Sequence, residues 1–145
     1  VEDARTEADV VVVYLHWGVQ GQSCPTDAQA DLADLLAGAG ADIVVGSHAH
    51  RLQGTGMLSD TYVAYGLGNF AWYTQASEAT TTTGVLTLTV DDGEVVDESW
   101  APARIGSDGL PDFVTGGEGE QMMNAFADLR DCTNLAPPPA AEQSG

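Results

Sequence analysis

Residues 10–18 read VVVVYLHWG and residues 42–50 read DIVVGSHAH. Each run is apolar and β-branched, and then becomes polar at a histidine that stands beside small residues. A strand that is buried on both faces of a parallel sheet has this composition. Open α/β sheets bind ligands at the carboxyl ends of such strands, which is where both runs place their histidines. The two runs therefore predict a parallel sheet with a functional site at its carboxyl edge.

A helix is predicted between the two runs. The segment Thr26-Asp27-Ala28-Gln29 fits a capping box, and apolar residues recur after it at helical spacing. These apolar residues are Ala28, Leu32, Leu35, Leu36 and Ala39. Strand, helix and strand over residues 9–46 predict a right-handed βαβ unit with parallel strands. If the two strands are neighbours, His16 lies close to His48 and His50.

Together with this βαβ unit, the remaining segments predict one mixed α/β domain over residues 1–134. We expect a short strand at 61–65, a tight loop at 66–70, a hairpin of 84–90 with 94–101 around Asp92-Gly93, and a helix at 118–130. Residues 102–117 carry no regular pattern. Residues 135–145 include Pro137-Pro138-Pro139 and predict a disordered tail.

The charge of the chain is strongly negative. It has 22 acidic residues against 4 arginines and no lysine, for a formal net charge of −18. Such a surface repels phosphate backbones and anionic lipids, so we exclude nucleic-acid binding. No apolar stretch approaches the roughly 20 residues of a membrane span, so we expect no direct membrane insertion by this chain. The chain starts with Val1 rather than Met, and we expect a signal or anchor upstream of it.

Cys24 and Cys132 are the two cysteines, and neither belongs to a C-x-x-C pair. A zinc–thiolate site is therefore not expected. Outside the cytoplasm they would form a disulfide between the start of the first long helix and the end of the last one. The alternative is two unrelated buried thiols.

The histidines carry the clearest chemical signal. Neutral imidazole is the commonest ligand of transition metals, and the spacing His48-Ala49-His50 after a strand suits one metal ion or two. His16 is followed by Trp17-Gly18, and a glycine lets the backbone pass close to a ligand. The alternatives are a pair of surface histidines and one core histidine. A carboxylate ligand is missing from this pattern, because Asp9 and Asp42 stand at the opposite ends of the strands.

Four further residues are candidates near the site. Asn69 could supply an amide or satisfy a turn, and Gln53 could bond a loop carbonyl or a substrate. Arg51 could contact an anionic substrate or stay solvated. Trp17 could wall a pocket, as could Trp72 and Tyr73 further along the chain, although aromatic residues at such places are more often part of the core.

Three motifs together resemble a known family. They are Leu15-His16-Trp17-Gly18, Gly46-Ser47-His48-Ala49-His50 with Gln53, and Tyr65-Gly66-Leu67-Gly68-Asn69-Phe70. Their order and spacing are similar to those of the CapA family, the bacterial poly-γ-glutamate capsule synthesis proteins of the calcineurin-like metallophosphoesterase superfamily. The resemblance covers about residues 8 to 105.

This resemblance implies a four-layer α/β/β/α sandwich, of which the chain would form the C-terminal part. It also implies a pair of divalent transition metals (Mn, Fe or Zn), with His16 and His48 on one ion, His50 on the other and Asn69 nearby. The acidic ligands of the family's first half are not found in this sequence. The partners would be that missing N-terminal half and an anionic polymer or a phosphoester substrate.

The resemblance leaves two kinds of function open. One is a metal-dependent hydrolase in the synthesis of capsule or another cell-surface polymer, placed outside the cytoplasm. The other is a non-catalytic accessory or degenerate metal-binding domain that acts in polymer export or anchoring.

Overall fold

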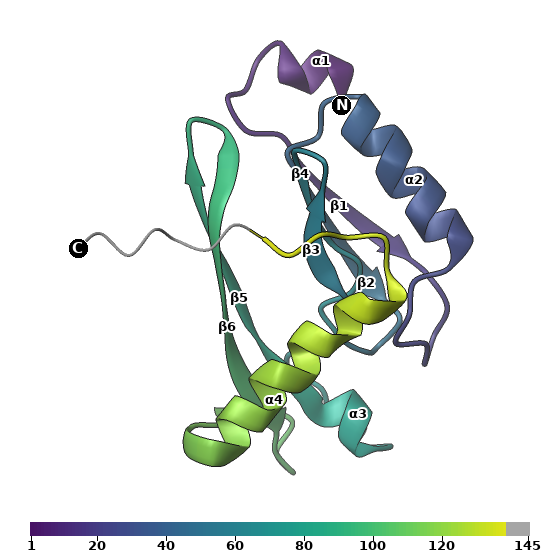
Figure 1. The fold of residues 1–145 in the computed structure, drawn as a ribbon. Coiled ribbons are helices and arrows are strands. Elements are labelled where there is room, and N and C mark those ends of the chain that lie inside the picture. Colours follow the sequence, from purple (N-terminus) through teal and green to yellow (C-terminus); the bar gives the residue numbers. More distant parts are fainter. Residues whose placement is uncertain (139–145) are drawn as a thin grey trace, which may run out of the picture.

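The protein is a mixed α/β structure with two sheets (Figure 1), seen in a computed structural model that describes residues 1–138. In chain order its elements are α1 (Glu2–Arg5), β1 (Val12–Trp17), α2 (Asp27–Gly38), β2 (Ile43–His48), β3 (Thr55–Leu58), β4 (Thr61–Ala64), α3 (Glu78–Thr81), β5 (Thr82–Asp91), β6 (Glu94–Ile105), β7 (Pro111–Phe113), α4 (Gly116–Asp128) and the 3-10 helix η1 (Leu129–Cys132).

The first sheet has the strand order β1-β2-β4-β3. β1 and β2 are parallel neighbours, in a register that runs from Val12 opposite Ile43 to Trp17 opposite His48. β4 is also parallel to β2, whereas β3 runs antiparallel to β4. The predicted βαβ unit is thus confirmed, and the carboxyl ends of β1 and β2 meet at one edge of the sheet.

Helix α2 starts as the sequence predicts but buries a different set of side chains. The Thr26 side chain accepts a hydrogen bond from the Gln29 backbone N–H, and the Gln29 side chain accepts one from the Thr26 N–H. Ala33 is fully buried against the sheet. Leu32 and Leu35, expected on the apolar face, are 38% and 70% exposed. The apolar face of α2 is therefore wider than the area that the sheet covers.

The second sheet is built on a long hairpin of β5 and β6, to which β7 adds a third antiparallel strand. The predicted turn at Asp92-Gly93 is confirmed, and both residues have the positive φ that a tight hairpin turn needs. β6 reaches Ile105 and β7 follows at Pro111. Both occupy part of the segment 102–117, for which no regular structure was predicted.

The two sheets pack face to face. Alternate residues of the first sheet point to opposite sides. Val44 packs towards α2. Ile43 points the other way and packs with Tyr62 of β4 and with Val95 of the hairpin. The layers are thus α2, the first sheet and the second sheet (Figure 1). Helix α4 packs on Trp100 through Met122 and Phe126, at the other end of the hairpin. This is an α/β/β arrangement, which agrees with the α/β class predicted.

The C-terminal segment is held in place at two points, one on the loop before α2 and one on the first sheet. A disulfide joins Cys24 to Cys132, with Cα atoms 5.7 Å apart, and so ties the loop before α2 to η1. Leu135 is buried, and Ala136 exchanges backbone hydrogen bonds of 2.8 and 2.9 Å with Met57 of β3. Leu135 and Ala136 therefore belong to the folded part rather than to a tail that begins at residue 135. The end of the predicted tail, residues 139–145, lies outside the described residues.

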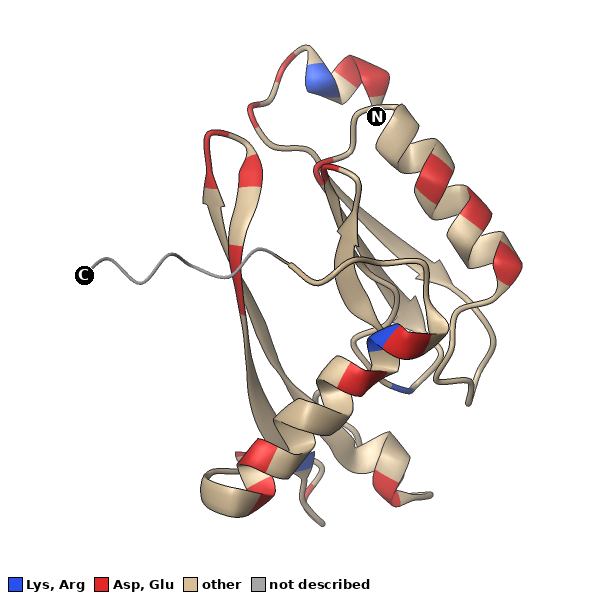
Figure 2. Cartoon of the chain, viewed as in Figure 1, with Lys and Arg blue, Asp and Glu red and all other residues tan. Residues whose placement is uncertain are grey.

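Acidic side chains are spread over α2, the tip of the β5–β6 hairpin and α4 (Figure 2). Within the described residues, no helix is long and apolar enough to cross a membrane.

Candidate metal centre

The three histidines gather at the carboxyl edge of the first sheet. His16 and His48 are at or next to the ends of β1 and β2, and their ring centroids are 4.5 Å apart. His50 stands two residues beyond β2, with its ring centroid 6.2 Å from that of His48. His16 and His48 are thus the closer pair, and His50 lies to one side of them.

The backbone around His48 and His50 is unusual. His48 has a φ of +101° and His50 a φ of +54°, in the region that residues other than glycine rarely adopt. Such conformations cost about 1–3 kcal/mol each and are concentrated at functional sites. Ala49 between them is buried, and its carbonyl accepts a hydrogen bond of 2.8 Å from the Gly21 N–H. The fold therefore holds both histidines in place at a cost in free energy.

Asn69 fixes the proton on His50. The Asn69 Nδ2 donates to the Thr80 carbonyl at 3.0 Å, so the Asn69 Oδ1 is the atom that faces His50. This oxygen lies 2.7 Å from His50 Nδ1 and can only accept, so Nδ1 carries the hydrogen. The Nε2 of a neutral His50 then has a free lone pair. A hydrogen bond of this kind typically orients a metal-binding histidine.

Ser47 orients His16 in a similar way. Its Oγ is 3.4 Å from the Leu15 carbonyl, to which it donates, and 3.3 Å from His16 Nδ1. The Ser47 lone pairs therefore face Nδ1, which favours a hydrogen on Nδ1 and a free Nε2. This role of Ser47 is not predictable from the sequence, because it depends on the register that pairs His16 with Ser47.

The carboxylates do not join the histidines. Asp42 lies at the start of β2, where its Oδ2 accepts from the Val11 N–H at 2.7 Å and pairs with Arg5. Across residues 1–138, no three His, Cys, Asp or Glu side chains are close enough together to hold a metal ion. The imidazoles offer the donor atoms that a divalent transition metal prefers, but the described residues do not complete a coordination shell.

Two tryptophans near the histidines have different roles. Trp17 turns into the core, where its Nε1 donates to the Tyr65 carbonyl at 2.8 Å and its ring stacks on Tyr65. Trp72 lies against His50, with ring centroids 4.9 Å apart, and stacks on the exposed Tyr73. Trp72 rather than Trp17 therefore walls the site.

A sequence model of the family described as bacterial capsule synthesis protein PGA_cap matches residues 1–74, half of the chain. The chain belongs to this family. It is 42% identical over 72 residues to the PGA biosynthesis protein CapA of Bacillus subtilis (strain 168). It is 43% identical over 68 residues to the capsule biosynthesis protein CapA of Bacillus anthracis. The alignments cover 50% and 47% of this chain but only 19% and 16% of the two relatives. The matched part is thus less than a fifth of either CapA protein.

The region matched to the PGA_cap family holds the three histidines, Asn69 and Trp72. Gln53 lies in the same region and is fully buried. Its Nε2 donates to the carbonyls of Gln22 and Cys24, and its Oε1 accepts from Gln29. Gln53 therefore holds the loop before α2 against the sheet.

Arg51 follows His50 directly but lines a separate cavity that extends to α3, β6 and α4. These three elements lie beyond the matched region, so the family comparison covers one wall of the cavity only.

Proposed function

We propose that this chain is the metal-binding C-terminal part of a CapA-type protein that acts in the synthesis of poly-γ-glutamate or another capsule polymer. The observation that carries the proposal is the convergence of His16, His48 and His50, with His50 held in the tautomer that leaves Nε2 free. The names of the two relatives support the role in capsule synthesis.

In this proposal the histidines serve a pair of divalent transition ions (Mn, Fe or Zn). His16 and His48, the closer pair of rings, would share one ion, and His50 would hold the other. Such a pair of ions can activate water and neutralise negative charge on a phosphoester substrate. The chain's own contribution is to position three imidazoles, and to shield His50 on one side with Trp72.

The remaining ligands would come from another part of the same polypeptide that packs beside β1. β1 is an edge strand, and its Val12 and Tyr14 are 57% and 68% exposed. Leu35 on the neighbouring helix is 70% exposed. Apolar side chains at an unpaired strand edge are suited to a further strand and its covering layer. That segment would bring carboxylates to the edge where the histidines lie.

We place the protein outside the cytoplasm. The disulfide between Cys24 and Cys132 supports this, because such bonds persist in oxidising compartments. A net charge of −18 makes a nucleic-acid partner unfavourable.

The rival function is a non-catalytic accessory in polymer export or anchoring. The observation that favours it is that no three His, Cys, Asp or Glu side chains in residues 1–138 are close enough together to hold a metal ion. Hydrolysis of para-nitrophenyl phosphate and of its diester by the full-length polypeptide, in Mn²⁺ or Zn²⁺, separates the two functions. The hydrolase predicts turnover that His50→Gln abolishes while the protein stays folded. Metal binding without turnover would support the accessory.

A further inference from the structure

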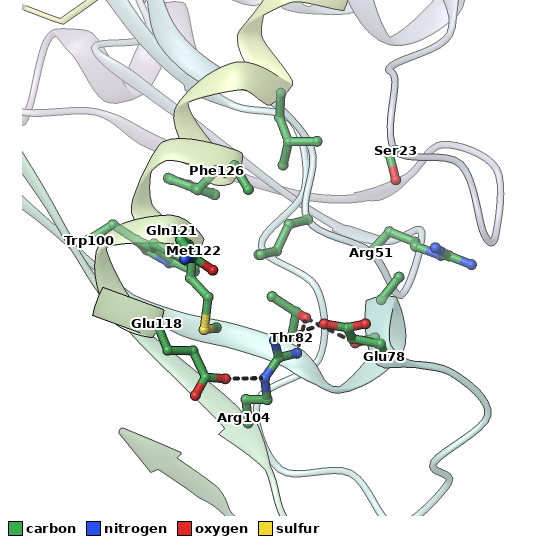
Figure 3. Close-up of a pocket in the computed structure, with 14 residues that line it drawn as sticks. Ser23, Arg51, Glu78, Thr82, Trp100, Arg104, Glu118, Gln121, Met122 and Phe126 are labelled. Carbon is green, nitrogen blue, oxygen red and sulfur yellow. Dashed lines mark hydrogen bonds and ion pairs between the residues drawn. The ribbon is translucent and has the colours of Figure 1, made fainter. Parts of the chain in front are cut away.

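A cavity of about 340 Å³ lies between α4, α3, β6 and the segment after His50 (Figure 3). Its wall is apolar and includes Leu52, Trp100, Met122 and Phe126, all less than 10% exposed. The rings of Trp100 and Phe126 are stacked with centroids 4.3 Å apart, so this wall is firmly packed. The volume is near the lower end of the range for small-molecule sites, which is roughly 300–1,000 Å³.

The rim of the cavity is charged, and most of its charges are paired. Arg104 donates to Glu78 at 2.8 Å and to Glu118 at 3.3 Å, and its third contact is Thr82 (Figure 3). This cluster carries one net negative charge. Arg51 also lines the cavity, and its charge brings the sum of the formal charges around the cavity to zero.

Arg51 stands apart from the other arginines. Arg5, Arg104 and Arg130 each form a salt bridge with an acidic side chain. Arg51 forms none with the described residues, and its Nε is buried without a hydrogen-bond partner. Acidic residues outnumber arginines by 22 to 4 in this chain, so an arginine without an acidic partner is unexpected. A buried N–H without an acceptor is unfavourable, and a bound anion would satisfy it.

We propose that this cavity binds a small amphipathic monocarboxylate, with its apolar body against Trp100 and Met122 and its carboxylate on Arg51. The guanidinium fork matches a carboxylate, and it would also match a phosphate. The formal charges around the cavity favour the carboxylate over the phosphate. They sum to zero, and Glu78 and Glu118 would repel a dianion more strongly than a monoanion. The site is separate from the histidines, since His50 faces Asn69 and Trp72.

The test is calorimetric titration of the full-length polypeptide with 3-phenylpropionate, in the presence of a chelator so that no metal ion competes for the carboxylate. We expect saturable binding, at least tenfold weaker binding of the neutral amide 3-phenylpropanamide, and weaker binding of phenyl phosphate. Equal binding of the acid and the amide would overturn the role of Arg51. Tighter binding of phenyl phosphate would overturn the choice of a carboxylate, and no binding of any probe would overturn the site.

Three substitutions test whether the probes bind in this cavity. Arg51→Gln should weaken binding of the carboxylate at least tenfold and leave binding of the amide unchanged. Arg5→Gln makes the same change in net charge at an exposed arginine outside the cavity, and should have no effect. Ala125→Trp fills the cavity from an exposed position of α4 and should abolish binding of both probes. Unchanged binding in Arg51→Gln and in Ala125→Trp, with melting temperatures preserved, would place the ligand elsewhere and contradict the proposal.

Discussion

Asn69 determines which nitrogen of His50 carries the hydrogen. It can do so because its own amide is fixed by the Thr80 carbonyl and its backbone carbonyl accepts from the Thr83 hydroxyl. Asn69 is only 7% exposed, so water does not compete for these bonds. In the proposed metal centre, Asn69 would thus prepare His50 to bind an ion without touching the ion itself.

Replacing Asn69 by alanine should release the His50 tautomer. In the unmodified protein we expect His50 to be the Nδ1–H form when neutral, and in Asn69→Ala to be a mixture in which Nε2–H dominates, as in free imidazole side chains. Imidazole ¹⁵N chemical shifts, measured at a pH where histidine is neutral, distinguish the two forms. An unchanged His50 spectrum in the variant would show that Asn69 does not set the tautomer.

Gly46 is a second residue whose identity is dictated by its neighbours. A Cβ at this position would overlap the Trp17 indole and the Tyr65 carbonyl, which are hydrogen-bonded to each other. Gly46→Ala should therefore lower the free energy of unfolding by at least about 2 kcal/mol, measured by urea unfolding.

The matched control is Gly38→Ala at the exposed end of α2, where an added Cβ meets nothing within 4 Å. It should raise the free energy of unfolding by about 0.5–1 kcal/mol, because alanine is the better helix former. Equal effects of the two substitutions would mean that the crowding around Gly46 is relieved at little cost.

At the scale of elements, the disulfide joins the loop before α2 to η1. It closes a loop with a sequence separation of 108 residues, and such a bond limits the freedom of the unfolded chain. The double variant Cys24→Ser, Cys132→Ser should lose about 2–5 kcal/mol of the free energy of unfolding. A reducing agent should produce the same loss in the unmodified protein and none in the variant. Two free thiols in the denatured, unreduced protein would contradict the pairing.

The elements that were predicted from the sequence are those whose signal is local. β1, α2 and β2 carry continuous apolar runs or a capping box, and the β5–β6 hairpin carries alternation around Asp92-Gly93. Four short elements were missed: α1, β3, α3 and β7. β3 includes Gly56 and exists through its pairing with β4 and Ala136, and β7 through its pairing with β6. The formation of β3 and β7 therefore depends on pairing with another strand, which the pattern within either segment does not reveal.

For the site, the meeting of the histidines was predictable from the sequence, whereas the contacts around them were not. The strand ends predicted that His16, His48 and His50 would meet, because parallel neighbours place their carboxyl ends together. The sequence could not show the inward turn of Trp17, the hydrogen bonds of Gln53 or the link from Thr80 through Asn69 to His50. Each of these contacts joins segments that only the folded chain brings together.

At the scale of the whole molecule, two tyrosines couple stability to alkaline pH. Burial raises the pKa of Tyr62 well above its ordinary value of 10.0, and the hydrogen bond to Glu98 adds to this rise. Burial, with a smaller contribution from Asp34, raises the pKa of Tyr65 to about 12. The folded protein therefore keeps both phenolic protons to a higher pH than the unfolded chain does.

Stability should be unaffected by these groups below about pH 10 and should fall above it. Between about pH 10 and pH 12 the unfolded chain loses the two protons and the folded chain keeps them. The free energy of unfolding should then decrease by about 1.4 kcal/mol per pH unit for each tyrosine. The free energy of unfolding, measured in urea at several pH values over this range, should fall less steeply with pH in Tyr65→Phe than in the unmodified protein. An identical slope in the two proteins would contradict the coupling.

A metal centre built on the three histidines should be directly visible in the metal content of the full-length polypeptide. Elemental mass spectrometry after gel filtration should find about two equivalents of Mn, Fe or Zn, and a loss of at least one equivalent in His48→Gln and in His50→Gln. Asp92→Asn, which removes a negative charge at the hairpin tip, is the control for ions held loosely by the acidic surface, and should keep both equivalents. The same metal content in all four folded proteins, or none in any, would contradict the account.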